Sequence, residues 1–116
     1  MKRRERERAK APGEERPSVA SVDRIIHEPA RLMICALLSG VDRADFLFVQ
    51  RETELTKGNL SSHLSKLEDA GYVEVTKTYE GKRPLTLVTL TDAGRVAFAE
   101  YRALMGSFMD GIGGAT

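Results

Sequence analysis

The sequence predicts a mainly helical α+β fold, with a three-helix core, a two-stranded β-hairpin and a long C-terminal helix. Apolar residues recur every three or four positions in three stretches between residues 29 and 70, and again over residues 92–109, which is the period of amphipathic helices. Residues 73–90 instead alternate apolar and polar side chains around a turn, which indicates a hairpin. The 116 residues are enough for one domain with a modest core.

Composition divides the chain into three parts. Residues 1–18 contain no branched aliphatic or aromatic residue, so we expect a disordered, mixed-charge tail. Residues 19–110 are expected to fold, and residues 111–116, which are rich in Gly, to be flexible. The tail is either a solubilising arm or a basic arm that lies along nucleic acid, and its interleaved Glu residues weaken the second interpretation.

Charge and cysteine content limit the function classes. The net charge is +1, but residues 1–16 hold seven Lys and Arg against four Glu, and the remainder holds eleven against thirteen acidic residues. Binding to nucleic acid must therefore depend on locally placed cations. No apolar run approaches the roughly 20 residues that span a bilayer, and one cysteine forms no internal disulfide. We expect a cytoplasmic protein that does not bind membranes.

The first long helix is expected to begin at Pro29, because a proline at the first helical position has no N–H that needs a partner. Ser21 or Asp23 can cap a turn before it, and Gly40 is suited to end it. Apolar residues cover most of the circumference of this helix, so we expect it to contact both its own core and a partner subunit. Cys35 lies within it and is interpreted as a core residue rather than a redox-sensing thiol.

A polar turn over residues 41–45 leads to a short helix over residues 46–52. Asp42 or Asp45 can act as the N-cap of that helix. A second helix follows after Thr56, the predicted N-cap. Two helices joined by a tight turn form a helix-turn-helix pattern.

The second helix of the pair, over residues 56–70, carries most of the functional information. Leu60, Leu64 and Leu67 form a narrow apolar stripe that faces the core. The opposite arc carries mostly short hydrogen-bonding side chains: Asn59, Ser62, Ser65, Lys66 and Asp69. A solvated helix usually carries long Glu and Lys, whereas these residues suit a face that lies close to another molecule. In a DNA groove, Asn and Ser can bind base edges while Lys contacts phosphate, and Gly58 lets the backbone approach a phosphate.

The hairpin is predicted from Val73 to Leu90, with a turn from Glu80 to Pro84. Its exposed tip carries two cations that can reach phosphate or a minor groove, Lys82 and Arg83. The competing interpretation is that any hairpin tip attracts solvated charge.

Thr91 is the predicted N-cap of the final helix, and Asp92 stands in its first turn, where a negative charge is favourable. The apolar stripe of this helix, over residues 92–109, is longer than a core of this size needs. We therefore expect it to pack on a second copy of the chain. The predicted homodimer contacts are Leu37, Phe98, Tyr101, Leu104, Met105 and Phe108.

Three motifs resemble the winged helix-turn-helix transcriptional regulators of the MarR and ArsR groups, over about residues 22–109. They are GNLSSHLSKLEDAGYVEV (58–75), YEGKRPLTLVTLT (79–91) and LTDAGR (90–95). The resemblance implies a recognition helix over residues 56–70 in the major groove of DNA and a wing over residues 79–85 on the backbone or minor groove. The implied DNA contacts are Thr56, Lys57, Asn59, Ser62, His63, Lys66, Lys82 and Arg83. Glu54 departs from the family, which often has a small residue or Gly at that place.

No cofactor or metal site is predicted. Cys35 is alone, and His27 and His63 lie on separate helices without a second ligand three or four residues away. His63 is interpreted as a phosphate or base contact, or as a structural partner of the wing. The sequence contains no HExxH, CxxC, P-loop or GxSxG motif, so an enzyme is not predicted.

Two functions remain. The first is a homodimeric, sequence-specific regulator of transcription that binds near-palindromic double-stranded DNA. The alternative is a protein-interaction module that kept the winged-helix fold and lost DNA binding. Acidic residues around the recognition helix motivate the alternative: Glu54, Glu68, Asp69 and Glu74. A chain this short has no separate sensor domain, so any small-molecule effector is expected at the dimer interface.

Overall fold

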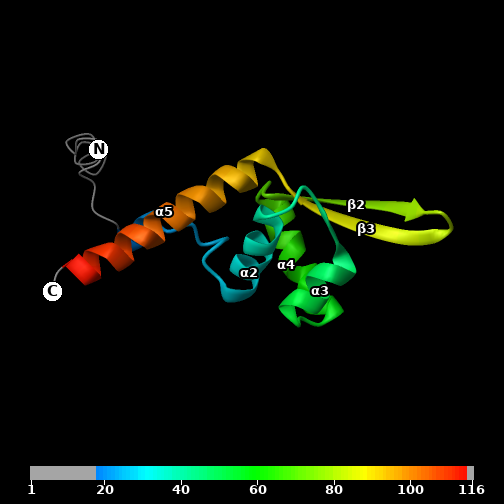
Figure 1. The fold of residues 1–116 in the computed structure, drawn as a ribbon, viewed down its shortest axis with the longest axis horizontal. Coiled ribbons are helices and arrows are strands. Elements are labelled where there is room, and N and C mark those ends of the chain that lie inside the picture. Colours follow the sequence, from blue (N-terminus) through cyan, green and yellow to red (C-terminus); the bar gives the residue numbers. More distant parts are fainter. Residues whose placement is uncertain (1–17, 115–116) are drawn as a thin grey trace.

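The computed structural model describes residues 18–114 and confirms the mainly helical fold with a small antiparallel sheet (Figure 1). The predicted disordered tail lies outside the described residues, apart from Ser18. No helix in the described part of the chain is long and apolar enough to cross a membrane. The elements, in chain order, are η1 (Val19–Ser21), α2 (Pro29–Ser39), β1 (Ala44–Asp45), α3 (Phe46–Thr53), α4 (Lys57–Asp69), β2 (Val73–Glu80), β3 (Arg83–Leu90) and α5 (Asp92–Gly114).

The entry into α2 is fixed by two carboxylates. Asp23, rather than Ser21, caps the preceding turn, because its Oδ1 accepts hydrogen bonds from the N–H groups of Ile25 (2.9 Å) and Ile26 (3.2 Å). Glu28 caps α2 itself by accepting from the N–H of Arg31 at 2.8 Å. This hydrogen bond is the main cause that lowers the pKa of Glu28. Helix α2 then buries three apolar side chains in the core: Ile34, Cys35 and Leu38.

The polar turn predicted over residues 41–45 contains a third strand that the sequence did not reveal. Ala44 and Asp45 form β1, which pairs antiparallel with Val88 and Leu87 of β3, so the sheet order is β1-β3-β2. Asp45 also caps α3, because its Oδ1 accepts from the N–H of Leu47 at 3.1 Å. A strand of two residues is too short to display the alternation by which strands are recognised in a sequence.

Helix α4 agrees with the prediction in its cap and in its buried face. The Thr56 hydroxyl oxygen accepts from the N–H of Asn59 at 3.1 Å, which satisfies one of the free donors at the helix start. Leu60, Leu64 and Leu67 are all buried. Gly71 follows with φ +82°, a left-handed conformation that Gly adopts readily and that turns the chain into β2.

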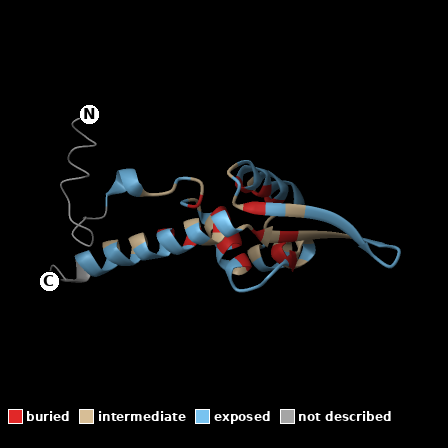
Figure 2. Ribbon diagram, turned by 90° about the horizontal axis from the view of Figure 1, so that it is seen from above, coloured by how far each residue is buried: buried red, intermediate tan, exposed pale blue. Residues whose placement is uncertain are grey.

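Strands β2 and β3 form a hairpin that extends away from the helices (Figure 1). Glu80 pairs with Arg83, so the loop contains two residues and is tighter than the predicted turn. Gly81 occupies its first position with φ +64°, where a two-residue hairpin favours Gly. Pro84 lies within β3 instead of ending the turn. The outer part of β2 is exposed, whereas β3 is exposed only at Arg83 and Pro84, next to the loop (Figure 2).

Helix α5 leaves the body in the direction opposite to the hairpin (Figure 1). Thr91 caps it by accepting from the N–H of Gly94 at 3.0 Å, as predicted. The same Thr91 hydroxyl donates to the carbonyl of Gly71 at 2.6 Å and so ties the start of α5 to the end of α4. Helix α5 continues to Gly114, so the first part of the segment that was expected to be flexible is helical.

Candidate nucleic-acid interface

The exposed arc of α4 presents the side chains that the sequence assigned to it. The buried leucines hold one face of the helix against the core, so the opposite face is turned to solvent. Five of the eight predicted DNA contacts lie along this helix or at its cap and are exposed: Thr56, Lys57, Asn59, Ser62 and Lys66. These groups supply hydrogen-bond donors, acceptors and two cations.

The beginning of α4 lies beside the hairpin, although the two are far apart in sequence. Lys57 and Arg83 line one hollow of about 200 Å³, together with Pro84 of β3. Lys82, the other cation predicted at the tip, is exposed in the two-residue loop. The helix start also carries partial positive charge from its aligned peptide dipoles. The fold therefore gathers positive charge where α4 and the hairpin meet.

A second hollow, of about 410 Å³, runs between α4 and the sheet. Lys57 and Lys77 both line it, together with the hydroxyls of Ser61 and Ser65. Sequence reasoning missed Lys77 because it read the strand only for its alternation. The useful signal was the position of Lys77 in β2, where it is exposed on the strand that adjoins α4.

Arg83 is already engaged within its own hairpin. Its guanidinium lies 3.1 Å from the Glu80 carboxylate, and both side chains are largely exposed, at 58% and 70%. An exposed pair of this kind contributes about 0–1 kcal/mol, so a phosphate can compete for the arginine. Arg83 thus remains accessible to a polyanion.

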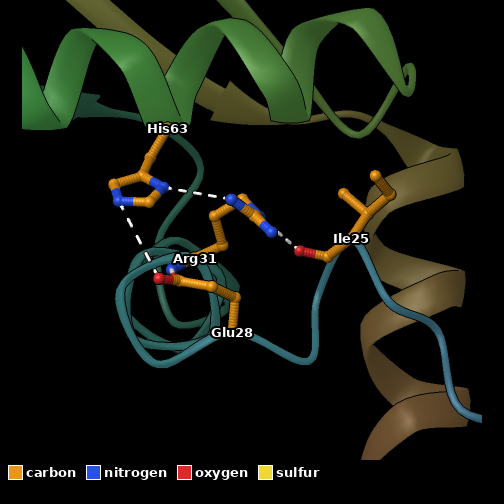
Figure 3. Close-up of polar contacts among 4 residues, drawn as sticks. All are labelled: Ile25, Glu28, Arg31 and His63. Atoms are coloured by element: carbon orange, nitrogen blue, oxygen red, sulfur yellow. Dashed lines mark hydrogen bonds and ion pairs between the residues drawn. The ribbon is translucent and has the colours of Figure 1, made fainter.

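The structure does not place His63 on the exposed arc. Its ring points toward the start of α2, where Nδ1 lies 3.1 Å from Nη1 of the buried Arg31 (Figure 3). Its Nε2 lies 4.0 Å from the Glu28 carboxylate, and the side chain is only 20% exposed. The interpretation of His63 as a structural partner of the hairpin is therefore wrong, and its contact with DNA stays a prediction. Its partners lie 32 and 35 residues away in the sequence, beyond the reach of a helical pattern.

Glu54 occupies the left-handed position at the end of α3, with φ +57°. Gly is the usual residue at such a position because a Cβ is unfavourable there. The departure from the family pattern noted at Glu54 is thus a matter of backbone conformation. The turn between α3 and α4 forms with Glu54 in place, at some cost in conformational energy.

The predicted dimer contacts divide into two groups. Phe98 and Tyr101 are each only 6% exposed and belong to the core of the single chain, so they leave little surface for a dimer contact. The Tyr101 hydroxyl also lies 2.8 Å from Nδ1 of His27. The others are partly exposed and remain candidates: Leu37, Leu104, Met105 and Phe108. Met109, which belongs to the predicted stripe, is 69% exposed, and Val96, which sequence reasoning did not single out, is 58% exposed.

The described residues contain no cluster of three or more His, Cys, Asp and Glu that can hold a metal ion. Cys35 is fully buried, and burial is the main cause that raises the pKa of its thiol to about 11. A thiol in that environment is a poor nucleophile, which agrees with a packing role.

Comparison with known proteins places the chain in a family. Residues 30–109 match the model of a winged helix DNA-binding domain. The uncharacterized protein MJ0432 of Methanocaldococcus jannaschii is 40% identical over 78 residues, which are 67% of this chain and 85% of that protein.

Solved structures show the same similarity. A transcriptional regulator homologue from Pyrococcus horikoshii OT3 has a TM-score of 0.73 and 34% identity, covering 76% of this chain and 87% of that one. A MarR-family transcriptional regulator from Silicibacter pomeroyi shares the fold, with a TM-score of 0.59 and 23% identity over 76% of this chain and 58% of that one. The resemblance inferred from the sequence motifs is confirmed, and the hairpin is the wing of the fold. The chain belongs to the winged-helix DNA-binding domain family, and the prediction of a DNA-binding regulator rather than an enzyme is confirmed.

Proposed function

We propose that this protein is a homodimeric transcriptional regulator that binds double-stranded DNA in a sequence-specific manner. In this proposal, α4 enters the major groove and the wing contacts the adjacent backbone or minor groove. One observation carries it: the solvent-facing polar arc of α4 adjoins the cations of the wing, with Lys57 and Arg83 lining one hollow. Asn59 and Ser62 then bind base edges, while the cations position the helix on the phosphates.

Charge balance supports a local rather than a general attraction to DNA. Glu68 lines the hollow between α4 and the sheet, and Glu80 pairs with Arg83. These acids weaken the electrostatic attraction between the protein and the phosphate backbone of any duplex. Discrimination between sequences must then depend on the groups that α4 directs into the groove.

The homodimer is proposed from the apolar side chains of α5 that the chain itself does not bury. Val96 and Met109 are exposed, and Leu104 and Phe108 are only partly covered by the chain itself. A second copy related by a two-fold axis can cover these side chains. Such a dimer would present two copies of α4 to half-sites about 34 Å apart on one face of the duplex. A hollow of about 240 Å³ beside α5, lined by Ser21 and Glu100 among others, is where we propose that any small-molecule effector binds.

Selection of bound duplexes from a random pool tests the proposal and identifies the binding site. We expect an enriched near-palindrome whose affinity falls steeply as salt rises from about 50 to about 200 mM, because binding releases counterions from phosphates. Asn59→Ala should then change the preferred sequence, whereas Lys66→Ala should weaken binding to all sequences alike.

The alternative, a protein-interaction module without DNA binding, makes a different prediction for the same experiment. No sequence would be enriched, and no duplex would bind even at low salt. The polar arc of α4 favours DNA over this alternative, since it carries the short side chains that can approach base edges.

A further inference from the structure

We infer that Arg31 is a positioning residue for DNA recognition, acting through a neutral His63, so that DNA affinity falls when His63 takes up a proton. This inference rests on the proposed DNA binding by α4. It concerns the contact between Arg31 and His63, on the side of α4 that faces α2, and not a contact with DNA. Figure 3 shows the four residues that carry it.

Arg31 is a buried cation with fixed partners. The residue is only 9% exposed, and it is buried alongside the core residues of α2. Its Nε donates to the carbonyl of Ile25 at 2.6 Å, which orients the guanidinium, and its Nη1 lies 3.1 Å from Nδ1 of His63. A buried guanidinium requires its donors to be satisfied, so this contact is costly to lose.

The hydrogen-bond donors around His63 determine which of its ring nitrogens carries a proton. Guanidinium nitrogens only donate hydrogen bonds, so Nδ1 of His63 must be the acceptor. The ring is therefore neutral, with its proton on Nε2, which points toward the Glu28 carboxylate 4.0 Å away. A second proton on Nδ1 would oppose donor to donor and bring two positive charges together.

The position of His63 on α4 relates this contact to DNA recognition. Asn59 precedes it by four residues and Lys66 follows it by three, so both are its neighbours on the helix surface. Rotation of α4 at His63 would move both side chains relative to a bound groove. Arg31 and Glu28 from the start of α2 are the charged groups that face the ring, and Lys66 is the charged group one turn along its own helix.

The inference predicts the opposite sign from a direct contact. A histidine that touches phosphate binds more tightly when protonated, because it gains positive charge. A histidine that must accept from Arg31 binds DNA less tightly when protonated, because the helix loses its support. The pH dependence of affinity therefore distinguishes the two roles.

The experiment measures affinity for the selected duplex by fluorescence anisotropy at constant ionic strength. We expect the wild-type protein to lose about tenfold in affinity between about pH 7.5 and about pH 5.5, because a protonated Nδ1 can no longer accept from Arg31. His63→Asn retains an acceptor at the place of Nδ1 and has no titrating ring, so its affinity should stay near the wild-type value and vary less than about twofold over this range.

Two control variants complete the design. His63→Gln places its amide near Nε2 and leaves Arg31 without its acceptor, so it should bind weakly at every pH. His27→Gln removes the only other histidine, which contacts Tyr101, and should keep the wild-type pH dependence. A wild-type affinity that rises at low pH, a His63→Asn profile parallel to the wild type, or a flat His27→Gln profile would each overturn the inference.

A second measurement on the free protein separates this inference from the proposed function. Amide NMR signals of α4 should shift with pH in the wild-type protein and far less in His63→Asn, whether or not DNA binds. Failure of every duplex to bind at pH 7.5 would remove the proposed function. In that case the role in DNA recognition falls with it. If duplexes do bind, α4 signals that do not respond to His63 would overturn the positioning role, and signals that do respond would support it.

Discussion

An added methyl group at Gly94 should lower the free energy of unfolding strongly. Gly94 lies in the first turn of α5, and a Cβ built there would overlap the carbonyl of Tyr72 and come within 3.0 Å of Cδ2 of Leu90. The Tyr72 carbonyl cannot move freely, because it accepts a hydrogen bond from the N–H of Thr91 at 3.0 Å. Gly94→Ala must therefore separate α5 from the end of α4.

The cost follows from what that separation breaks. The Thr91 hydroxyl bond to Gly71 and the Thr91 N–H bond to Tyr72 are both strained or lost. Each is worth about 1 kcal/mol. Poorer packing of Phe98 on the core adds about 1–2 kcal/mol, as is usual for strain and overpacking. We expect Gly94→Ala to lower the free energy of unfolding by about 3–4 kcal/mol.

Chemical denaturation with circular dichroism measures this loss, and α5 provides a matched control. At Gly106, in the same helix, an added Cβ would meet no atom within 4 Å. Gly106→Ala should therefore raise the free energy of unfolding by about 0.5–1 kcal/mol through helix propensity alone. If Gly94→Ala proves as stable as Gly106→Ala, the close approach of α5 to Tyr72 does not exist in solution.

The remaining predictions concern the turn, the helix start, the wing and the dimer. Glu54→Gly should raise the free energy of unfolding by about 0.5 kcal/mol, because it relieves the left-handed strain at φ +57° while loosening the unfolded chain; a loss on denaturation would contradict this. Gly58→Ala meets no atom within 4 Å, so thermal melting should show a small gain in stability, and binding assays a loss of DNA affinity if a phosphate approaches the backbone there. Arg83→Ala should weaken binding to all duplexes and lower the salt slope by about one unit; an unchanged slope would remove the wing from the phosphates. Leu104→Glu or Phe108→Glu should give monomers by light scattering, and an intact dimer would exclude α5 as the interface.

The sequence predicts the long elements well because each repeats its signal over several turns or pleats. Three leucines at helical spacing define the buried face of α4, and alternation over residues 73–90 defines the wing. Strand β1 has only two residues, so it repeats nothing. Its pairing with β3 depends on tertiary structure, which places residues 44–45 beside residues 87–88.

The sequence predicted the solvent-facing residues of α4 but not the contacts that α4 makes with α2. Periodicity identifies which residues of α4 oppose the leucines, and these are exposed as expected. It does not identify what the flank of the helix meets. His63 lies on that flank, and its partner Arg31 comes from another helix. Arg31, near the start of α2, was the residue that could have indicated such a contact, because a buried cation needs hydrogen-bond acceptors.

The same limit explains why the stripe on α5 was assigned as a whole to a partner. The helix is anchored at Thr91 and extends outward at about 1.5 Å per residue, so its early residues lie over the body and its late ones lie beyond it. Phe98 and Tyr101 are therefore used by the chain's own core. The later apolar residues are the ones that we propose a second copy covers. The point at which α5 is anchored therefore determines which residues pack in the core and which remain available to a partner.

This anchoring point also connects the two proposed functional surfaces. Gly71 and Tyr72 follow the end of α4, and their carbonyls hold the start of α5 through Thr91. The Tyr72 hydroxyl donates to Asp23 at 2.6 Å, which ties the same junction to the segment that leads into α2 and Arg31. These contacts fix the direction of α5 relative to the exposed polar arc of α4. In the proposed dimer they therefore also fix the direction in which α5 meets a second copy. In the proposed dimer, a change at this junction alters the separation of the two recognition helices without touching either the dimer contact or the DNA.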